Sequence, residues 1–407
     1  MTDDRGFIII GASLAGAKAA QTLREEGFGG RVVLIGEEPV RPYERPPLSK
    51  EYLQGKAEAD AAFVHDPGYY DQHDIDLRLS TRVRGLEPRD REVVLASGER
   101  IGYDAVLLAT GAVPRRLQVP GAALAGVHYL RDLADAERLR AAITAGGRVV
   151  VIGAGWIGCE VAASARQLGA DVAMVERGRL PLERVLGPEL GRFYRDVHAD
   201  HGVELHSGVG VEALRGGDRV EQVRLTDGTA LAADVVVVGV GVTPRVELAE
   251  AAGLTLGNGV VTDEYLATSA AGVFAAGDVA SAWHPLLARR IRLEHWSSAL
   301  NQGPAAARNM LGRRVRYEQL PYFYSDQYDV GMEYSGHAPG WDRVVFRGDP
   351  ASRGFIAFWL KDGRVAAGMN VNVWDVAGPI AALVASGRPV EESRLLDPDV
   401  ELATLAG

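Results

Sequence analysis

The sequence predicts an α/β protein made of two similar Rossmann-like modules and a smaller C-terminal α+β domain. Two glycine-rich turns each join a short apolar run to an Ala-rich stretch with helical composition. In both cases the next apolar run ends at a glutamate. From about Pro321 the pattern changes to alternating apolar and polar residues, which is typical of an antiparallel sheet.

The first module opens with the apolar run 7–10, which leads into a turn with Gly11, Ser13 and Gly16 at its fingerprint positions. A helix is expected to about residue 26 and a strand over 32–35, ending at Glu37. This order of elements is typical of a dinucleotide-binding βαβ unit. Ser13 replaces the middle glycine, so its hydroxyl either hydrogen-bonds to a phosphate or is simply tolerated.

The second module repeats this order with the run 148–152, the turn glycines Gly153, Gly155 and Gly158, a helix to about 168, and a strand over 172–175 ending at Glu176. Each strand-end glutamate is placed to accept hydrogen bonds from an adenosine ribose, although a solvated carboxylate is the alternative. The charge of Glu176 disfavours a 2′-phosphate and so favours NADH over NADPH. Arg177 and Arg184 could instead hold that phosphate.

Each module then contains a hairpin, an aspartate and an apolar strand that ends in glycine. The spacing between these features is the same in both modules. Asp104 precedes the strand to Gly111, and Asp234 precedes the strand to Gly241. A later run, 272–278, is expected to have no counterpart in the second module and to return to the first sheet. We therefore expect a discontinuous first domain at 1–112 and 245–320, a second at 113–244, and a third at 321–407.

The ending Gly277-Asp278 assigns the nucleotides. A strand-end aspartate in the cleft could accept a hydrogen bond from the ribityl chain of FAD, which a nicotinamide nucleotide lacks. FAD is therefore assigned to the first module and NADH to the second, the alternative being that Asp278 caps the following segment. In the third domain, strands are expected over 343–347, 354–361 and 364–371, with a helix near 377–385.

The bulk composition limits the classes of function. The formal net charge of −10 argues against generic nucleic-acid binding. No apolar run is long enough for a membrane helix, and the first residues do not look like a secretory signal, so we expect a cytoplasmic protein. The single cysteine, Cys159, excludes a dithiol within one chain and is interpreted as a packing residue.

Several motifs resemble the NADH-dependent ferredoxin and rubredoxin reductases of the putidaredoxin reductase type, which share a glutathione reductase-like fold. The matching segments are Tyr43-Glu44-Arg45-Pro46-Pro47-Leu48-Ser49-Lys50, Tyr129-Leu130-Arg131, Gly158-Cys159-Glu160, Arg292-Leu293-Glu294-His295-Trp296 and Pro321-Tyr322-Phe323-Tyr324-Ser325-Asp326-Gln327-Tyr328. They extend over nearly the whole chain. One departure is Tyr324, where the family commonly has tryptophan.

The resemblance implies functional residues. Lys50 would lie near the flavin and pair with Glu160 across the interface of the first two domains, although a surface salt bridge is the ordinary alternative. We expect the FAD contacts to be Gly11, Ser13, Ala15, Gly16, Glu37, Arg45, Lys50, Val83, Ala109, Thr110, Gly111, Arg131, Gly277, Asp278, Trp296 and Tyr324. We expect the NADH contacts to be Gly153, Gly155, Ile157, Gly158, Glu160, Glu176 and Gly241, while His295 is interpreted as structural.

The resemblance also implies electron transfer from NADH through FAD to a [2Fe-2S] ferredoxin or a rubredoxin that serves a cytochrome P450 or an aromatic-ring dioxygenase. The expected basic docking patch, for which ordinary solvated arginines are the alternative, comprises Arg289, Arg290, Arg292, Arg313, Arg314 and Arg316. A flavin NADH oxidase is one alternative function. A redox-sensing interaction protein resembling apoptosis-inducing factor is the other.

Overall fold

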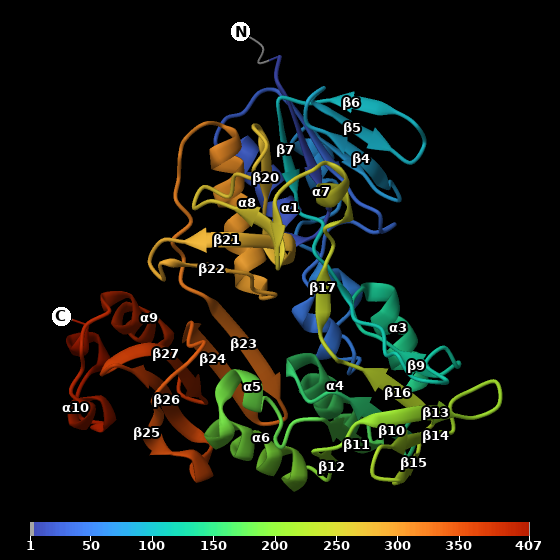
Figure 1. Cartoon of the computed structure of the whole chain (residues 1–407), viewed down its shortest axis with the longest axis vertical. Helices are drawn as coiled ribbons and strands as arrows, with labels where there is room; N and C mark the ends of the chain where they lie inside the picture. Colours follow the sequence, from blue (N-terminus) through green and yellow to red (C-terminus); the bar gives the residue numbers. More distant parts are fainter. Residues whose placement is uncertain (1–3, 407) are drawn as a thin grey trace. The chain divides into compact units, whose positions relative to one another are not determined.

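The computed structural model describes residues 4–406 and contains two compact units (Figure 1). Unit 1 comprises residues 1–44, 62–113 and 243–322, and unit 2 comprises 45–61, 114–242 and 323–407. Residues 45–61 thus group with unit 2, although the predicted first domain included them. The division into three domains stays a prediction. Within the described part of the chain, no helix is both long and apolar enough to cross a membrane.

The centre of unit 1 is a five-stranded parallel sheet in the order β20-β7-β1-β2-β3. Its strands are β1 (Gly6–Ile10), β2 (Arg31–Ile35), β3 (Ile75–Arg78), β7 (Ala105–Leu108) and β20 (Val273–Ala275). β1 and β7 are buried along their whole length, which explains their unbroken apolar sequences. β20 pairs with β7, so the predicted return of the chain to this sheet is confirmed.

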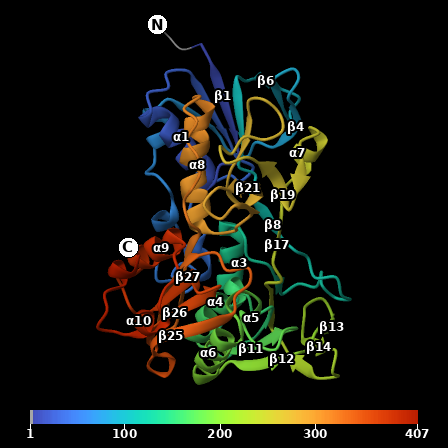
Figure 2. The ribbon, with the colours of Figure 1, turned by 60° about the vertical axis from the view of Figure 1, so that its left-hand side comes forward.

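Helices α1 (Leu14–Glu25) and α8 (Trp296–Met310) lie side by side in unit 1, as Figures 1 and 2 both show. Their close approach depends on Gly303, where a Cβ atom would lie only 2.3 Å from the carbonyl oxygen of Ala15. Glycine at this position therefore lets α8 pack directly on the backbone of α1.

Smaller elements complete unit 1. The predicted antiparallel excursion is a three-stranded sheet, β4-β5-β6. The remaining bounds are β4 (Val83–Glu87), β5 (Glu92–Leu95), β6 (Arg100–Gly102), α2 (Tyr69–Gln72), α7 (Glu247–Ala251), β18 (Leu256–Gly257), β19 (Gly259–Thr262), β21 (Ala280–His284) and β22 (Arg289–Ile291). The short strands β8 (Ala112–Pro114) and β17 (Val242–Pro244) occur where the chain passes between the units.

Unit 2 contains a second parallel sheet, in the order β12-β11-β10-β16-β9. Its elements are β9 (Val127–His128), α3 (Leu133–Ala142), β10 (Arg148–Ile152), α4 (Trp156–Gln167), β11 (Asp171–Glu176), α5 (Glu183–Leu186), α6 (Pro188–Asp200), β12 (Glu204–Ser207) and β16 (Val235–Val238), with the excursion β13 (Val211–Arg215), β14 (Gln222–Leu225) and β15 (Ala230–Ala232).

The expectation that β20 has no counterpart in the second module is wrong. β9 pairs in parallel with β16, at the edge position that β20 occupies beside β7. β9 precedes β10 in sequence, whereas β20 follows all the other strands of the first sheet. The strand β9 is only two residues long. That is too short to give a periodic signal in the sequence.

The aspartates at matching positions in the two modules have the same structural role. The carboxylate of Asp104 accepts a hydrogen bond from the backbone N–H of Gly6, with 2.7 Å between the atoms. That of Asp234 accepts one from the backbone N–H of Arg148 at 2.9 Å. Gly6 and Arg148 are the first residues of β1 and β10. The aspartates thus satisfy a donor at the start of the central strand, which explains the repeated spacing.

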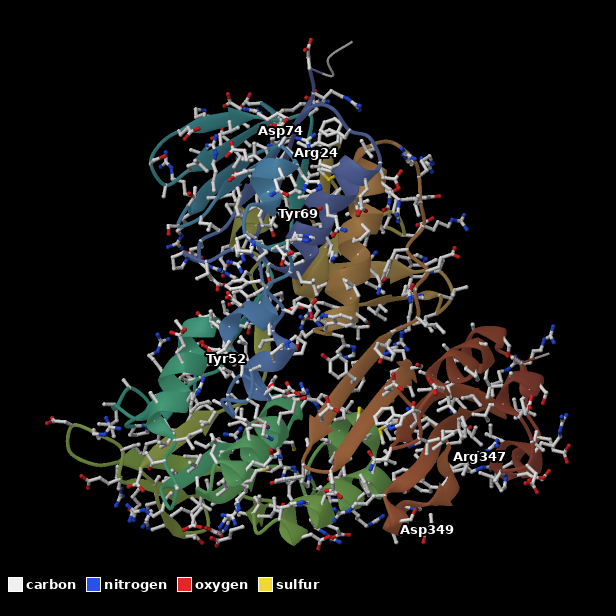
Figure 3. All side chains as sticks on the ribbon, turned by 180° about the vertical axis from the view of Figure 1, so that it is seen from behind. Arg24, Tyr52, Tyr69, Asp74, Arg347 and Asp349 are labelled. Atoms are coloured by element: carbon white, nitrogen blue, oxygen red, sulfur yellow. The ribbon has the colours of Figure 1, made fainter. Side chains whose placement is uncertain are left out.

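The C-terminal part of unit 2 is an antiparallel sheet in the order β23-β24-β27-β26-β25. The predicted strands and helix are confirmed as β25 (Arg343–Asp349), β26 (Gly354–Lys361), β27 (Arg364–Val371) and α9 (Ala377–Ser386), and β23 (Tyr322–Gln327), β24 (Val330–Gly336) and α10 (Glu392–Leu396) are additional. Arg347, labelled in Figure 3, donates hydrogen bonds to the carbonyls of Pro398 and Val400 and so attaches the last residues to the sheet.

Residues 45–61 are attached to unit 2 by specific side chains. They begin with the 3₁₀ helix η1 (Pro46–Ser49), which starts with two prolines. The Tyr52 hydroxyl, labelled in Figure 3, donates to Glu137 of α3 at 3.2 Å. Gln54 donates to the Ser164 hydroxyl of α4 at 2.9 Å.

Candidate functional site

The first glycine turn has two positions that exclude any side chain. Gly11 has φ = +120°, and a Cβ atom there would lie 2.0 Å from the carbonyl oxygen of Ala109. A Cβ atom at Gly16 would lie 2.0 Å from the carbonyl oxygen of Gly11. Both distances are far inside van der Waals contact, so the turn requires glycine at these positions.

The second turn repeats this geometry and accounts for Ser13 in the first. A Cβ atom at Gly158 would lie 1.9 Å from the carbonyl oxygen of Gly153, which itself has φ = +101°. A Cβ atom at Gly155, however, would meet no described heavy atom within 4 Å. The middle position therefore faces open space within the fold, and a serine fits there. Ile157, beside this turn, leaves 44% of its surface exposed.

The helices after the two turns are suited to anions. Ser13 and Gly155 are the N-cap residues of α1 and α4, and among the described residues neither helix has a side-chain cap or an acid in its first turn. By contrast, α3 begins with a capping box in which Asp132 and Asp135 accept backbone hydrogen bonds. An uncapped N-terminus offers N–H groups and the positive end of the helix dipole. Both turns therefore fit a dinucleotide pyrophosphate.

The two strand-end glutamates have different partners. Glu37, in unit 1, accepts a hydrogen bond from Arg245 at 2.8 Å and lies 3.5 Å from the Arg82 guanidinium. Glu176, in unit 2, accepts hydrogen bonds from the backbone N–H groups of Ala154, at 2.7 Å, and Gly178, at 2.8 Å. The carboxylate of Glu176 is thus fixed against its own glycine turn, where each oxygen keeps a lone pair for a ribose hydroxyl.

Most of the other candidate FAD residues of unit 1 form hydrogen bonds with neighbouring groups. The backbone N–H of Gly277 donates to Gln302 at 2.8 Å, and the carbonyl of Asp278 accepts from Arg292 at 3.1 Å. The indole N–H of Trp296 donates to Glu44 at 2.9 Å. Thr110 donates to the carbonyl of Arg245. Val83 is buried in β4, and Ala109 and Gly111 lie one and three residues after the end of β7.

A buried polar cluster of unit 2 is centred on Glu160, in the second turn of α4. Lys50 Nζ lies 3.0 Å from a Glu160 carboxylate oxygen, and these side chains are only 6% and 5% exposed. Glu160 also accepts hydrogen bonds from the hydroxyls of Ser49 and Ser325, and Lys50 donates to the carbonyl of Pro46. Such additional bonds are needed to offset the cost of removing two charges from water.

Further candidate residues lie around Lys50 in the same unit. The ammonium of Lys50 is 5.4 Å from the centre of the Tyr324 ring. Arg45 donates a hydrogen bond to the carbonyl of Arg131, and the N–H of Arg131 donates to Asp135. Gly241, with φ = +96°, accepts from the backbone N–H of Arg115 at 2.9 Å. Tyr324 therefore keeps an aromatic face next to the lysine.

The sequence predicts structural roles for Cys159 and His295; the surroundings of Cys159 agree with this, while the role of His295 stays a prediction. Cys159 is fully buried in the core of unit 2, where burial raises the pKa of its thiol and its S–H points to the carbonyl of Ala154 at 3.6 Å. A thiol with a raised pKa is a poor nucleophile. His295 is the N-cap residue of α8.

The arginines of the expected docking patch lie in unit 1, where most of them contact neighbouring residues. Arg290 donates to the carbonyls of Thr262 and Ser281, and Arg292 pairs with Glu294 while only 7% exposed. Arg313 pairs with Glu26 at 2.6 Å. The Arg314 guanidinium lies 4.7 Å from the centre of the Tyr265 ring. Arg316 lies 3.5 Å from the hydroxyl of the same tyrosine. Arg289 is exposed on β22.

The sequence interpretation missed the polar residues that surround Glu160. Ser49, Ser325, Gln327 and His198 are all buried. Ser49 and Ser325 lie within the quoted motifs, but hydroxyl residues are common in any sequence. The available signal was a serine and a glutamine at alternate positions of a strand, which place their side chains on one face.

Two glycine turns built alike, each before an uncapped helix, and a buried lysine–glutamate pair define an oxidoreductase that uses FAD and NAD(H). The sequence matches the family described as pyridine nucleotide-disulphide oxidoreductase over residues 6–303 and the reductase C-terminal family over 322–406. The ferredoxin–NAD(+) reductase component of the anthranilate 1,2-dioxygenase system of Burkholderia cepacia is 40% identical, over 98% of both chains.

Putidaredoxin reductase of Pseudomonas putida is 37% identical, over 99% of this chain and 97% of that one. The structure of the covalent putidaredoxin reductase–putidaredoxin complex matches with a TM-score of 0.96 and 36% identity, covering 99% of this chain and 98% of that one. The chain belongs to the pyridine nucleotide-disulphide oxidoreductase family, among its reductases of the putidaredoxin reductase type. With one cysteine, it has no dithiol of its own.

Proposed function

We propose that the protein transfers electrons from NADH, through bound FAD, to a [2Fe-2S] ferredoxin that serves a cytochrome P450 or an aromatic-ring dioxygenase. The duplicated glycine turn carries this proposal. Gly16 and Gly158 each occupy a position where a Cβ atom would strike the turn's own first carbonyl. Hydride transfer between two dinucleotides needs two such sites in one protein. The relatives named above are reductase components of this kind.

In this proposal FAD supplies the redox chemistry, taking two electrons as hydride from NADH and passing them on one at a time. The turn at Gly11, Ser13, Ala15 and Gly16 holds the FAD pyrophosphate against the N-terminus of α1. Lys50 would supply the positive charge that favours the negative charge of the reduced flavin ring. Glu160 keeps that ammonium oriented through the 3.0 Å ion pair.

For the nicotinamide nucleotide, we propose that Gly153, Gly155 and Gly158 hold the pyrophosphate at the start of α4. Ile157 contacts the ligand, because its exposed side chain lies at this helix start. Glu176 accepts hydrogen bonds from the adenosine ribose and repels a 2′-phosphate. A cytoplasmic location is part of this proposal, as expected from the sequence.

The proposed docking surface for the ferredoxin comprises Arg289, Arg290, Arg313, Arg314 and Arg316. Arg290 and Arg314 are anchored to Thr262 and Tyr265, three residues apart, so the two arginine clusters lie near each other in unit 1. A basic surface steers an acidic partner, and electron-transfer complexes are typically small and transient. A rubredoxin is the alternative carrier, since both proteins accept single electrons.

A stopped-flow experiment tests the function. The FAD-loaded protein is reduced with NADH and then mixed either with a [2Fe-2S] ferredoxin or with oxygen. Fast flavin reduction and much faster reoxidation by ferredoxin than by oxygen is the expected result. Faster reoxidation by oxygen would identify an NADH oxidase instead. Slow reduction to a long-lived charge-transfer complex would identify a redox sensor.

A further inference from the structure

A chain of buried hydrogen bonds leads from the core of unit 2 to Glu160. Ser325 Oγ donates to Glu160 at 2.7 Å, and Gln327 Nε2 donates to Ser325 Oγ at 3.2 Å. The ring Nε2 of His198 lies 3.0 Å from Gln327 Oε1, and His198 Nδ1 lies 3.4 Å from the Tyr328 hydroxyl. Ser325 and Gln327 are each 1% exposed, and His198 is fully buried.

Every link of this chain points its proton in the same direction. Gln327 Oε1 can only accept, so the proton of His198 must lie on Nε2. Burial lowers the pKa of His198 to about 4, so the ring is neutral at pH 7 and its Nδ1 accepts from Tyr328. Because Gln327 donates to Ser325 Oγ, the serine proton is directed to Glu160. Aligned hydrogen bonds strengthen one another.

We propose that Ser325, Gln327 and His198 are positioning residues that orient a hydroxyl donor onto Glu160 and thereby set how much of the Lys50 charge is available to the flavin. This proposal rests on the proposed function. If the Ser325 proton were lost, Glu160 would hold more of its charge uncompensated and would draw more on Lys50. The reduced flavin would then be less stabilised.

Unlike Ser49, the neighbouring side chains of Cys159, Tyr194 and Asp326 do not donate a proton to Glu160 in the described structure. The Cys159 thiol donates to the carbonyl of Ala154 instead, and because burial raises the pKa values of Cys159 and Tyr194, neither places a negative charge beside Glu160 at pH 7. Burial also raises the pKa of Asp326, a change that Lys50 opposes. Asp326 is itself an acid next to Glu160, so it cannot donate while it is ionised. Ser49 remains the second hydroxyl donor to Glu160.

The first experiment compares Ser325→Ala, which removes the donor, with Ser325→Thr, which keeps it. Ser335→Ala is the matched control, because Ser335 is another buried serine, on the neighbouring strand β24. The measured quantities are the two-electron midpoint potential of bound FAD and the rate of its reduction by NADH. For Ser325→Ala we expect a potential lower by about 30 mV, the equivalent of a tenfold change. We also expect reduction to slow about tenfold.

Ser325→Thr and Ser335→Ala should both retain the wild-type potential. A Ser325→Ala potential equal to that of Ser335→Ala would overturn the proposal. If instead wild-type FAD is not reduced by NADH at all, the proposed function fails, and the hydrogen-bond chain is then judged by the next experiment alone.

The second experiment tests the direction of the hydrogen-bond chain by a measurement that needs no enzymatic turnover. ¹⁵N NMR of histidine-labelled protein should show His198 with its proton on Nε2 from pH 6 to 8, and a proton on Nδ1 would contradict the proposed direction. Substitution of His198 provides the functional counterpart. His198→Gln keeps a donor near the Nε2 position and should retain the flavin potential, whereas His198→Leu should lower it in the same direction as Ser325→Ala. Equal potentials for these two variants would exclude His198 from the chain.

Discussion

Replacing Glu160 with glutamine should destabilise unit 2 strongly while leaving its shape intact. The carboxylate lies 3.0 Å from Lys50, and both side chains are at least nine-tenths buried. Glutamine has nearly the same volume, but its single amide oxygen can accept from only one of Ser49 and Ser325, which donate to different carboxylate oxygens, and it removes the counter-charge of the ammonium. Breaking a buried pair by removing one partner costs about 3 to 5 kcal/mol. We expect a loss of this size in urea unfolding followed by circular dichroism.

The double variant Lys50→Met, Glu160→Gln separates stability from function. With neither charge buried, at least about 2 kcal/mol of the loss should be recovered. Reduction of FAD by NADH should nevertheless be slower in the double variant than in the wild type, because the Lys50 cation is gone. The exposed pair Lys361–Asp342, at 2.7 Å, is the matched control, and Asp342→Asn should have a far smaller effect. Additive losses in the double variant would refute the reasoning, since they would mean that the two charges do not interact.

Three further predictions concern single residues. Glu176→Ala should reduce the ratio of kcat/KM for NADH to that for NADPH, and an unchanged ratio would remove this residue from the ribose site. Gly158→Ala should impair folding, because its Cβ would lie 1.9 Å from a carbonyl oxygen, whereas Gly155→Ala should fold normally and raise the KM for NADH. The Arg148 side chain lowers the pKa of Asp234 to about 2, so this carboxylate stabilises the fold above about pH 4 and loses that contribution as the pH falls towards 2. The difference in urea stability between wild type and Asp234→Asn should therefore narrow between pH 5 and pH 3, and a constant difference would contradict the assignment.

The parallel sheets were predictable because buried parallel strands have unbroken apolar sequences. β10 has the predicted bounds, and β1, β2 and β11 are each extended by one or two residues. β9 was missed because its position depends on pairing with β16, which two residues of sequence cannot reveal. The antiparallel strands β23 and β24 were also missed. Their tyrosines, serines and acids obscure the alternation, because polar residues such as Ser325 and Gln327 face the buried side.

The candidate site was predictable where backbone geometry restricts the residue type. Gly11 and Gly16 are specified by steric contact, and such positions leave a pattern in the sequence. The grouping of residues 45–61 with unit 2 was not predictable, because it depends on long-range contacts such as that between Gln54 and Ser164. The tautomer of His198 likewise depends on partners more than a hundred residues away in the chain.

Helix α4 connects the two halves of the proposed chemistry. Gly158 belongs to its nucleotide turn, and Glu160 follows two residues later on the same rigid element. Ser164 lies one turn beyond Glu160, on the same helix face, and donates to the carbonyl of Ser49 at 2.7 Å. The segment that carries Lys50 is thus fastened to α4 at two successive turns. If Gly158 holds NADH as proposed, we therefore expect any shift of α4 on nucleotide binding to displace Lys50 as well.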